Sequence, residues 1–587
     1  MEELPIELNI ITLNCWGLLH LSAHRAERLA AIGRELAAAD PPPHIVALQE
    51  CWTQEDYRSI RRETRFALPF GKFYYGGIFG TGLAILSRWP IEESSMYRYP
   101  LNGRPTAFYR GDWFVGKGVA CARIRYGTGD RDIVEVFNTH THAIYEHPPK
   151  HEDSYQVQRL AQCWEMAKLI RGAAERGHLA VALGDFNDVP GSLSYRILTA
   201  HSPIRDAWRV LSPDSSLGSA AHELERARRR PIPSAEFNIA ENGVTSNSAY
   251  NTWSWPKSDQ RTLRSGKRPM IIPPDTPDPR GKRIDYIFFS PQISSTPGPV
   301  PLPLNEARAS RDISQGSRTS GWVVKDVRIG MLARHPDLGC SLSDHFSVEA
   351  TLLLHSSSTT FSPSRPPSSP PSPTSPHHKP NNNNLHPDDK QGDSSDGGPE
   401  HAASLLALEH GTYLQSPTGS EFRVGSRLDL RASHDAQLRD SASRASTARR
   451  GDGLDCSTYD EILALIHAYG LREISQRRWR IAHFFVWTLV VVGCYVGIWF
   501  VGQWPGIGFA FLVLSSLGFM MGVLDGLMGL LFFGSEIRAL AEFEWEIMNA
   551  KATASGAHGL LAQQHQRGEE DVGAGGGGGG VGEEKGW

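Results

Sequence analysis

The sequence predicts an α/β fold in which two packed β-sheets lie between helices, followed by a C-terminal hairpin of two transmembrane helices. Three observations lead to this prediction. Apolar, strand-like runs first alternate with helical segments and then follow one another in series up to about residue 355. A polar segment rich in Ser, Pro and Asn comes next. Two apolar runs near the C-terminus are each long enough to cross a bilayer core.

The composition indicates a chain of several domains with almost no net charge. Its 587 residues include 60 Lys and Arg against 64 Asp and Glu, so no global basic field points to nucleic acid. The seven cysteines include no Cys-x-x-Cys pair, which predicts reduced thiols in a cytosol-facing protein. The N-terminal residues lack a basic region followed by an apolar one, so a cleaved signal peptide is not expected.

The first half of the chain supplies most of the predicted strands. A strand at 6–13 is followed by a helix at 23–39, which should end at Asp40 because three prolines come next. The further predicted elements are strands at 44–49, 72–77, 82–88, 97–100 and 133–137, a helix at 154–175 and a short helix at 195–199. The polar segments 212–279 and 290–320 are expected to be insertions.

The most informative stretch is 181–187, with the sequence Val-Ala-Leu-Gly-Asp-Phe-Asn. It predicts a buried strand that delivers Asp185 and Asn187 to a loop at its C-terminal edge. A carboxylate can hold a hard divalent cation or orient a water, and an amide can donate to a phosphate oxygen. Taken alone, the stretch fits an Asx-rich turn equally well.

Companion motifs occur at the ends of other strand-like runs, in a fixed order. They are Leu-Asn-Cys-Trp-Gly at 13–17, Leu-Gln-Glu at 48–50, Asn-Thr-His at 138–140, Arg-Ile-Asp-Tyr at 283–286 and Ser-Asp-His-Phe at 343–346. Together with Asp185 and Asn187, this ordered set resembles the endonuclease/exonuclease/phosphatase superfamily of metal-dependent phosphodiesterases. The resemblance covers about residues 6–355 and implies a four-layered α/β sandwich.

The resemblance implies a metal site. A lone Glu after a strand is usually a solvated carboxylate, but Glu50 becomes the best ligand candidate when Asn14 and the Asp185 motif stand in order beside it. Glu50 would bind the metal with help from Asn14 and Asp185. Mg²⁺ is the expected cofactor, because it takes few protein oxygens and keeps several waters.

The resemblance also implies catalytic roles for residues that match the other motifs. His345 has a pKa range suited to taking a proton from water near neutral pH. Either Asp285 or Asp344 would orient its ring. His140 and Asn187 would hold the phosphate in the transition state.

Residues 111–118 formally match part of a nucleotide-binding loop, but Gly118 stands where such a loop needs Ser or Thr. The segment instead resembles one in neutral sphingomyelinases and the fungal inositol phosphosphingolipid phospholipases C. Those proteins carry an Asp and a Lys five residues apart, a spacing that Asp112 and Lys117 match. The resemblance implies a conformational switch that permits catalysis; the alternative is a hairpin with incidental charges.

The C-terminal part is expected to tether the catalytic domain to a membrane. The predicted order after the catalytic domain (1–355) is a disordered linker at 356–455, an amphipathic juxtamembrane helix at 456–480, transmembrane helices at 481–502 and 507–533, and a helical, then Gly-rich tail at 536–587. Basic residues flank both spans, so the positive-inside rule predicts a cytosol-facing catalytic domain. Gly518, Gly522 and Gly526 should allow close helix packing, and Asp525 should face the partner helix or water.

The whole pattern looks like a fungal-type inositol phosphosphingolipid phospholipase C, the counterpart of neutral sphingomyelinase. The implied reaction is Mg²⁺-dependent hydrolysis of inositol phosphoceramides or sphingomyelin to ceramide and a phosphorylated head group. Membrane sphingolipids are the expected substrates and anionic phospholipids the expected activators, with no nucleic acid partner. The endoplasmic reticulum or the mitochondrial outer membrane is the expected location.

Three alternatives remain at this point. A nuclease should show a basic groove and needs no membrane spans. A phosphoinositide 5-phosphatase should show Trp-Cys-Asp-Arg, whereas residues 282–286 read Lys-Arg-Ile-Asp-Tyr. A catalytically silent membrane tether would not be expected to keep the whole motif set.

Overall fold

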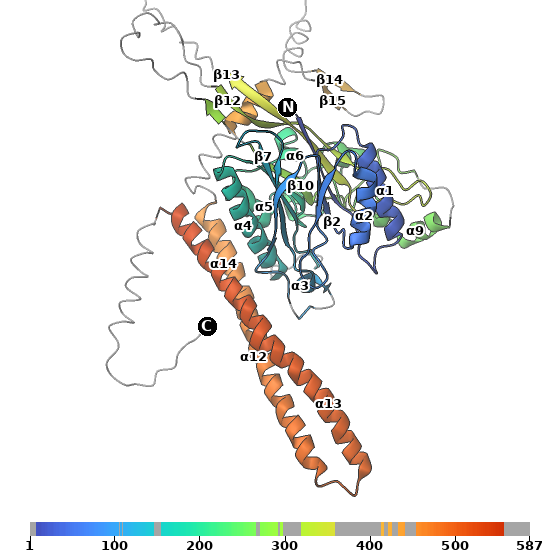
Figure 1. Ribbon diagram of the computed structural model, residues 1–587, viewed down its shortest axis with the longest axis vertical. Helices are drawn as coiled ribbons and strands as arrows, with labels where there is room; N and C mark the ends of the chain where they lie inside the picture. Colours follow the sequence, from blue (N-terminus) through green and yellow to red (C-terminus); the bar gives the residue numbers. More distant parts are fainter. Residues whose placement is uncertain are drawn as a thin grey trace, which may run out of the picture. The chain divides into compact units, whose positions relative to one another are not determined.

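The computed structural model describes residues 7–104, 106–107, 110–145, 154–265, 271–291, 294–296, 318–358, 412–415, 421–424, 432–440 and 454–556 (Figure 1). The chain divides into two compact units. The first consists of Met1–Gln292, Trp322–Leu354 and Arg439–Trp587, and the second of Ile293–Gly321 and His355–Leu438. The motif residues and the C-terminal helices all belong to the first unit.

A seven-stranded mixed sheet is built around the first strands of the chain. Its order is β11-β12-β13-β1-β2-β4-β3. Strand β1 (Glu7–Asn14) is parallel to β2 (Ile45–Gln49) and antiparallel to β13 (Ser347–Ser358). The other members are β3 (Phe70–Phe73), β4 (Ala84–Ser87), β11 (Ser294–Thr296) and β12 (Arg318–Gly330), and helices α1 (Arg25–Ala38) and α2 (Gln54–Thr64) cover the outer face.

A six-stranded sheet in the order β5-β6-β7-β8-β10-β9 faces the first. Strand β7 (Ile133–His140) is parallel to β8 (Leu179–Asp185), and β10 (Asp285–Ser290) is antiparallel to β8. The other members are β5 (Ile91–Arg98), β6 (Gly118–Arg125) and β9 (Arg205–Asp206), and helices α4 (Ser154–Glu175) and α5 (Leu193–Ala200) cover the outer face.

Alternation along each strand produces the layers. In β1, Ile10 points into the core between the sheets, whereas Ile11 and Leu13 pack against α1. In β8, Val181 and Leu183 face the same inter-sheet core, whereas Ala180 and Ala182 face α4. Because both faces of both sheets are buried, helices must cover the two outer faces, and the predicted four-layered α/β sandwich is confirmed.

Several element predictions need correction or a change of bounds. The predicted strand at 72–77 has the wrong bounds: β3 spans Phe70–Phe73, and a loop follows because Gly76 and Gly77 interrupt the pattern. Residues Asp112–Val115 form a short helix, α3, rather than a hairpin. Helix α6 (Ala207–Leu211) directly precedes the segment 212–279, which itself contains the helices α7 (Glu223–Ala227), α8 (Ala235–Ala240), η2 (Thr252–Ser254) and α9 (Lys257–Arg264). Most of 290–320 lies outside the described residues.

Parts of the predicted linker have secondary structure. Strand β13 continues to Ser358, past the expected domain end at 355, although its pairing with β1 ends at Leu353. Within 356–455, which was expected to lack structure, the described residues include strands β14 (Thr412–Gln415) and β15 (Glu421–Val424) and a helical stretch at 432–440. The rest of the predicted linker lies outside the described residues.

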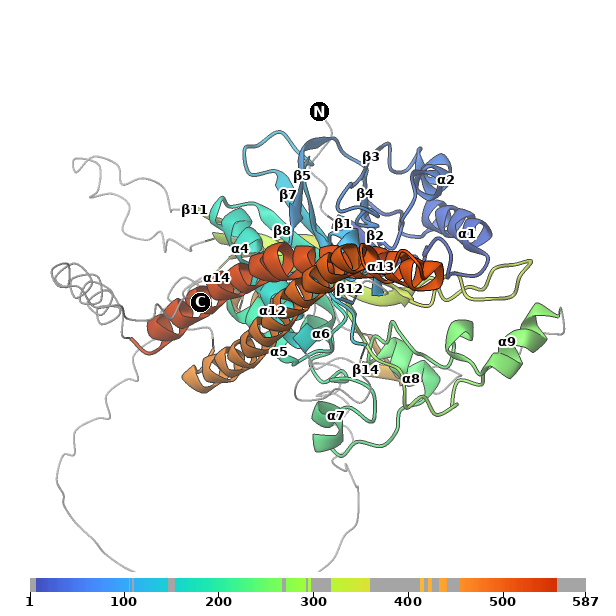
Figure 2. The same cartoon turned by 90° about the horizontal axis from the view of Figure 1, so that it is seen from below.

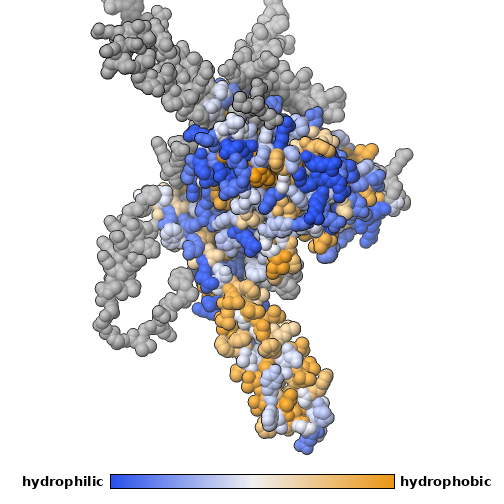
Figure 3. Space-filling view, viewed as in Figure 1, coloured by the Kyte–Doolittle hydropathy of each residue, from blue (hydrophilic) through white to orange (hydrophobic). Residues whose placement is uncertain are grey.

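The C-terminal region is a long helical hairpin (Figures 1 and 3). It consists of α12 (Cys456–Ile498), α13 (Pro505–Leu527), the π-helical turn η3 (Met528–Phe532) and α14 (Phe533–Ala554). Helix α12 is continuous, so the predicted juxtamembrane helix and first span are one element. By length and composition, two helical segments could cross a membrane, and Figure 3 shows apolar surface along this hairpin.

Contacts inside the hairpin agree with the sequence pattern. A Cβ atom on Gly518 would lie 2.6 Å from the Trp487 ring, and one on Gly526 would lie 2.9 Å from Phe484, so the glycine ridge permits close packing. Asp525 faces α12, where it accepts hydrogen bonds from Arg480 at 2.5 Å and pairs with His483 at 2.6 Å.

The base of the hairpin packs on the sandwich (Figure 2). Tyr459 and Ile462 of α12 and Phe543 of α14 share a buried cluster with residues of α4. Gln158 of α4 donates from Nε2 to Tyr469 Oη and Glu536 Oε1, both at 2.9 Å. The hairpin and the α/β sandwich are therefore one packed unit.

A buried ion pair anchors the β9–β10 edge, and its loss should destabilise the fold. Arg283 donates from Nη1 and Nη2 to the two carboxylate oxygens of Asp206, at 3.0 and 2.8 Å, with both side chains almost fully buried. Asp206→Ala would leave the Arg283 charge buried and unpaired, so we expect a loss of about 3 kcal/mol in unfolding free energy. Denaturant unfolding of the detergent-solubilised protein measures this loss. Glu93→Ala, which breaks an exposed pair with Arg123, is the matched control and should cost less than about 1 kcal/mol.

Candidate active site

Strand ends from both sheets bring the motif residues together. Asn14 ends β1 and Glu50 follows β2, while His140 ends β7 and Asp185 ends β8. Because the strands of each of these pairs are parallel, their carboxyl ends emerge at the same edge. Asp285 begins the antiparallel strand β10 and stands opposite Asp185, and His345 lies two residues before the start of β13.

Asp185 is the centre of the site. Its Oδ2 accepts a hydrogen bond from Asn14 Nδ2 at 3.0 Å and lies 3.5 Å from His140 Nε2 and 3.9 Å from His345 Nε2. Its Oδ1 accepts from the backbone N–H of Asn187 at 2.9 Å. One carboxylate thus contacts four of the predicted site residues.

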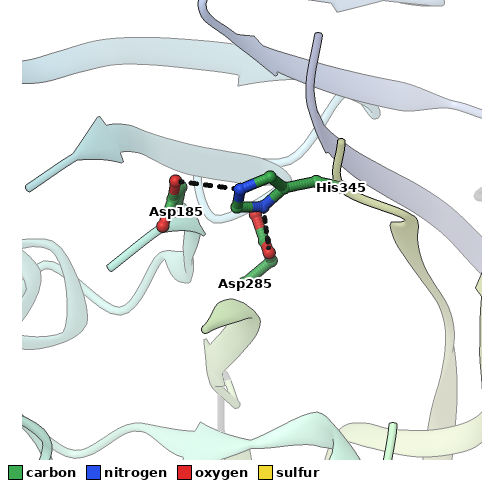
Figure 4. Close-up of side chains that lie close together, drawn as sticks. All are labelled: Asp185, Asp285 and His345. Carbon is green, nitrogen blue, oxygen red and sulfur yellow. Dashed lines mark hydrogen bonds and ion pairs between the residues drawn. The ribbon is translucent and has the colours of Figure 1, made fainter. Parts of the chain in front are cut away.

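His345 is oriented by Asp285 (Figure 4). The ring Nδ1 lies 2.8 Å from Asp285 Oδ2, which leaves Nε2 directed towards Asp185. The carboxylate of Asp344 contacts Ser343 Oγ at 3.4 Å, and no bond from it to the His345 ring occurs among the described residues. Of the two acids that the sequence left open, Asp285 is the one that holds the ring.

Burial and charge set the pKa values of the carboxylates. Burial raises the pKa of Glu50 to about 7, and the nearby Asp344 adds to this rise. Burial alone would raise the pKa of Asp185 too, but the charge of His345, together with hydrogen bonds from the Asn187 backbone N–H and from Asn14, outweighs it and leaves that pKa below its usual value. Asp185 is therefore an anion, whereas the charged form of Glu50 is disfavoured near neutral pH, because the charge of His345 offsets its burial only in part.

The two histidines are shifted in opposite directions. Burial lowers the pKa of His140 to about 3, with Lys117 adding to the effect, so this ring is neutral. Burial would also lower the pKa of His345, but Asp285 and Asp185 hold it well above its usual range. His140 can then serve as a neutral hydrogen-bond donor, and its buried Nδ1 has no partner among the described residues.

The oxygen atoms around Glu50 fit a hard cation. Glu50 Oε1 accepts from Asn14 Nδ2 at 3.1 Å, whereas Oε2 is buried without a hydrogen-bond partner in the described part of the chain. Glu50 also has a positive φ of 52°, which a non-glycine residue rarely adopts and which is typical of functional sites. Ligand atoms of Asp185, Asp285 and His345 lie within 4.8 Å of one another and form a second candidate metal group. Nδ1 of His345 and Asp285 already bond each other, however, which favours the Glu50 side.

Asp112 and Lys117 lie beside this centre. Gly111 and Gly116 flank α3 with φ values of 81° and 64°, so the helix is confined to one turn. Lys117 Nζ lies 3.4 Å from Asp112 Oδ1 and donates to the carbonyl of Thr141 at 2.8 Å. The same carbonyl accepts from Asn187 Nδ2 at 3.2 Å. Lys117 thus shares a hydrogen-bond acceptor with a predicted site residue.

Other residues of the site were not predicted. Tyr145 donates to Asp112, and His142 lies 3.7 Å from the same carboxylate, so both support α3. Between the sheets, Gln49 Nε2 donates to Asn138 Oδ1 at 2.7 Å. Gln49 belongs to the Leu-Gln-Glu motif and Asn138 to the Asn-Thr-His motif. Membership of these motifs is the signal that could have identified them. Nothing in the local sequence distinguishes Tyr145.

Comparisons with known proteins identify the family of this chain. A model described as "Endonuclease/Exonuclease/phosphatase family" matches residues 11–345. An inositol phosphosphingolipids phospholipase C from Schizosaccharomyces pombe is 37% identical over 352 residues, which cover 60% of this chain and 69% of that protein. The protein of the same name from Saccharomyces cerevisiae is 26% identical over 565 residues, covering 93% and 90%. Human sphingomyelin phosphodiesterase 2 is 32% identical over 203 residues, covering 35% and 46%.

The chain therefore belongs to the endonuclease/exonuclease/phosphatase family. Within that family it groups with the inositol phosphosphingolipid phospholipases C and neutral sphingomyelinases, as the Asp112 and Lys117 motif suggested.

Proposed function

We propose that this chain is a metal-dependent phospholipase C that hydrolyses sphingolipid phosphodiesters, such as inositol phosphoceramides and sphingomyelin, to ceramide and a phosphorylated head group. The observation that carries the proposal is the Asp285–His345 pair directed at Asp185. The chain that holds this pair is 37% identical, over 352 residues, to an inositol phosphosphingolipids phospholipase C. The apolar hairpin supports a lipid substrate, because it would hold the site at the bilayer surface.

Mg²⁺ is the proposed cofactor, with Glu50 as its main ligand and Asn14 and Asp185 beside it. The carboxylate oxygens of Glu50 and Asp185 fit this ion, and Glu50 Oε2 has no partner among the described residues. Asn14 instead turns Nδ2 to both carboxylates, while its Oδ1 accepts from the Trp16 N–H. When bound, the ion would neutralise phosphate charge, steady the ceramide-side leaving oxygen and offset the carboxylate charge that keeps His345 protonated.

The chain's own groups would then do the remaining work. His345 would take a proton at Nε2 from the attacking water, while Asp285 fixes the ring through Nδ1. Neutral His140 and the amide of Asn187 would donate hydrogen bonds to the phosphate oxygens as negative charge develops. Asp344 would contribute negative charge near the metal rather than orient the base.

The Asp112 and Lys117 pair is proposed to act as a switch that sets the position of Thr141 and Asn187. Lys117→Met removes the donor to the Thr141 carbonyl at nearly constant volume, so we expect kcat to fall by about 100-fold with Mg²⁺ affinity unchanged. Steady-state kinetics against Mg²⁺ concentration measures both. Lys72→Met, at an exposed lysine of β3, is the matched control. Equal kcat values for the two variants would contradict the switch.

The proposed topology places both ends of the hairpin in the cytosol. Residues 481–502 and 507–533 would span the bilayer, and Arg477, Arg478 and Arg538 would lie at its cytosolic face. The same basic residues would favour anionic phospholipids as activators. The endoplasmic reticulum or the mitochondrial outer membrane would house the protein, with 1–355 as its catalytic domain and no nucleic acid partner.

The substrate class is tested by offering inositol phosphoceramide, sphingomyelin and abasic DNA in parallel to the detergent-solubilised full-length protein, with Mg²⁺ or EDTA. We expect Mg²⁺-dependent ceramide release and no DNA cleavage, and the two lipids rank the head groups. DNA cleavage alone would replace the proposal with a nuclease. No reaction, even with anionic lipid added, would favour the silent tether.

A further inference from the structure

The loop between β3 and β4 exposes two large apolar side chains. Ile78 is 75% exposed and Phe79 is 62% exposed, in the sequence Gly-Gly-Ile-Phe-Gly. An exposed, adjacent aliphatic and aromatic pair is costly in water and typical of a surface that contacts lipid or protein.

This loop is bonded to α3 rather than free. The backbone N–H of Gly77 donates to the Val115 carbonyl at 3.1 Å, and that of Phe79 donates to the Phe114 carbonyl at 3.3 Å. A Cβ atom on Gly77 would lie only 2.6 Å from the Phe114 carbonyl oxygen, so the two backbones need glycine to approach this closely. The loop and α3 therefore move as one body.

Helix α3 in turn contacts the hairpin. The rings of Trp113 and Phe532 pack edge to face with centroids 4.9 Å apart. Phe532 lies at the end of the apolar run, just after the exposed Leu530 and Leu531. On α12, exposed Trp479 stands beside the basic residues 477 and 478, a combination typical of the boundary between lipid and water.

We propose that the Ile78–Phe79 loop inserts into the head-group region of the bilayer in which the hairpin is anchored. The inference rests on the proposed membrane crossing of the hairpin, because Trp113 and Phe532 place α3 at the level where that crossing begins. Figure 3 shows apolar surface on the sandwich near the start of the hairpin. The loop would thus contact lipid on one side and α3 on the other. Lys117 follows α3, and it donates to the Thr141 carbonyl that also accepts from Asn187.

Lipid contact can be measured without turnover, which separates this proposal from the proposed reaction. The full-length protein with Ile78→Cys is labelled with the environment-sensitive dye nitrobenzoxadiazole and reconstituted into phosphatidylcholine and phosphatidylserine vesicles. The label at 78 should shift to the blue and be quenched by spin-labelled phospholipid. The same label at Phe66→Cys, whose parent side chain is 84% exposed, should do neither. The unsubstituted chain, in which five of the seven cysteines are buried, corrects for background labelling.

Turnover provides the second test. Ile78→Ser with Phe79→Ser should reduce hydrolysis of substrate in vesicles about tenfold, while hydrolysis of a water-soluble phosphodiester stays within about twofold of the parent. Phe79→Trp should keep the vesicle activity, because tryptophan also favours the interface. Phe66→Ser should leave both activities unchanged. A label at 78 that remains as exposed to water as the label at 66 would overturn the proposal, as would equal loss on both substrates.

Discussion

Replacing His345 by alanine is expected to lower kcat for sphingolipid hydrolysis by roughly 10³-fold, the middle of the range for loss of a general base. The imidazole of His345 directs Nε2 at Asp185, and Asp285 Oδ2 holds the ring in this orientation at 2.8 Å from Nδ1. Alanine removes the proton acceptor without adding a new contact. The bound metal and the donors from His140 and Asn187 should leave a small residual rate.

The measurement is ceramide release at saturating Mg²⁺, with Mg²⁺ binding and thermal unfolding recorded on the same preparation. His20→Ala, at an exposed histidine of the same domain, is the control and should behave as the parent protein. Asp285→Asn should lower kcat in the same direction, because the amide cannot favour the same ring tautomer. A His345→Ala variant with parental kcat would assign the base to another residue.

Glu50→Gln is expected to weaken Mg²⁺ binding and to lower activity by roughly 100-fold or more at moderate Mg²⁺ concentration. The change is nearly isosteric and replaces a charged ligand by a neutral one. In metal-free protein its effect on stability should be small or even favourable, because burial already raises the pKa of Glu50 to about 7 and disfavours its charge. Activity and apo stability should thus change in different ways.

Calorimetric titration with Mg²⁺ and thermal unfolding in EDTA test both parts. Glu55→Gln, at an acidic residue in the first turn of α2 for which no ligand role is proposed, is the control. If Glu50→Gln binds Mg²⁺ with unchanged affinity, the metal site would instead be assigned to Asp185, Asp285 and His345.

Much of the sandwich could be predicted because its strands have clear apolar patterns and end in recognisable motifs. Asn14, Glu50, His140 and Asp185 each stand at the carboxyl end of a strand, and parallel neighbours bring such ends together. The glycine spacing in the second span similarly predicted a helix contact that the structure contains.

The choice between Asp285 and Asp344 could not be made from sequence. Asp344 is adjacent to His345 in the chain, but the pairing of β10 with β8 places Asp285 opposite Asp185 and beneath the imidazole. Register between distant strands is a tertiary property, so local patterns carry little information about it.

Other misses have local causes. The juxtamembrane helix and first span were divided at 480 because polarity changes there, yet no Pro or Gly interrupts residues 471–492, so the backbone continues as α12. The predicted strand at 72–77 includes Gly76 and Gly77, and Gly77 approaches α3 so closely that a Cβ atom would not fit. Consequently, the link between that loop and the Asp112 and Lys117 pair became visible only in the structure.

The most direct test of the proposed reaction is hydrolysis of inositol phosphoceramide in H₂¹⁸O with Mg²⁺, followed by mass spectrometry of both products. Attack of water on phosphorus with ceramide as the leaving group places ¹⁸O in the phosphorylated head group and leaves ceramide unlabelled. EDTA should abolish the reaction. Labelled ceramide 1-phosphate, or turnover that persists in EDTA, would contradict the assignment of this site as a metal-dependent phospholipase C.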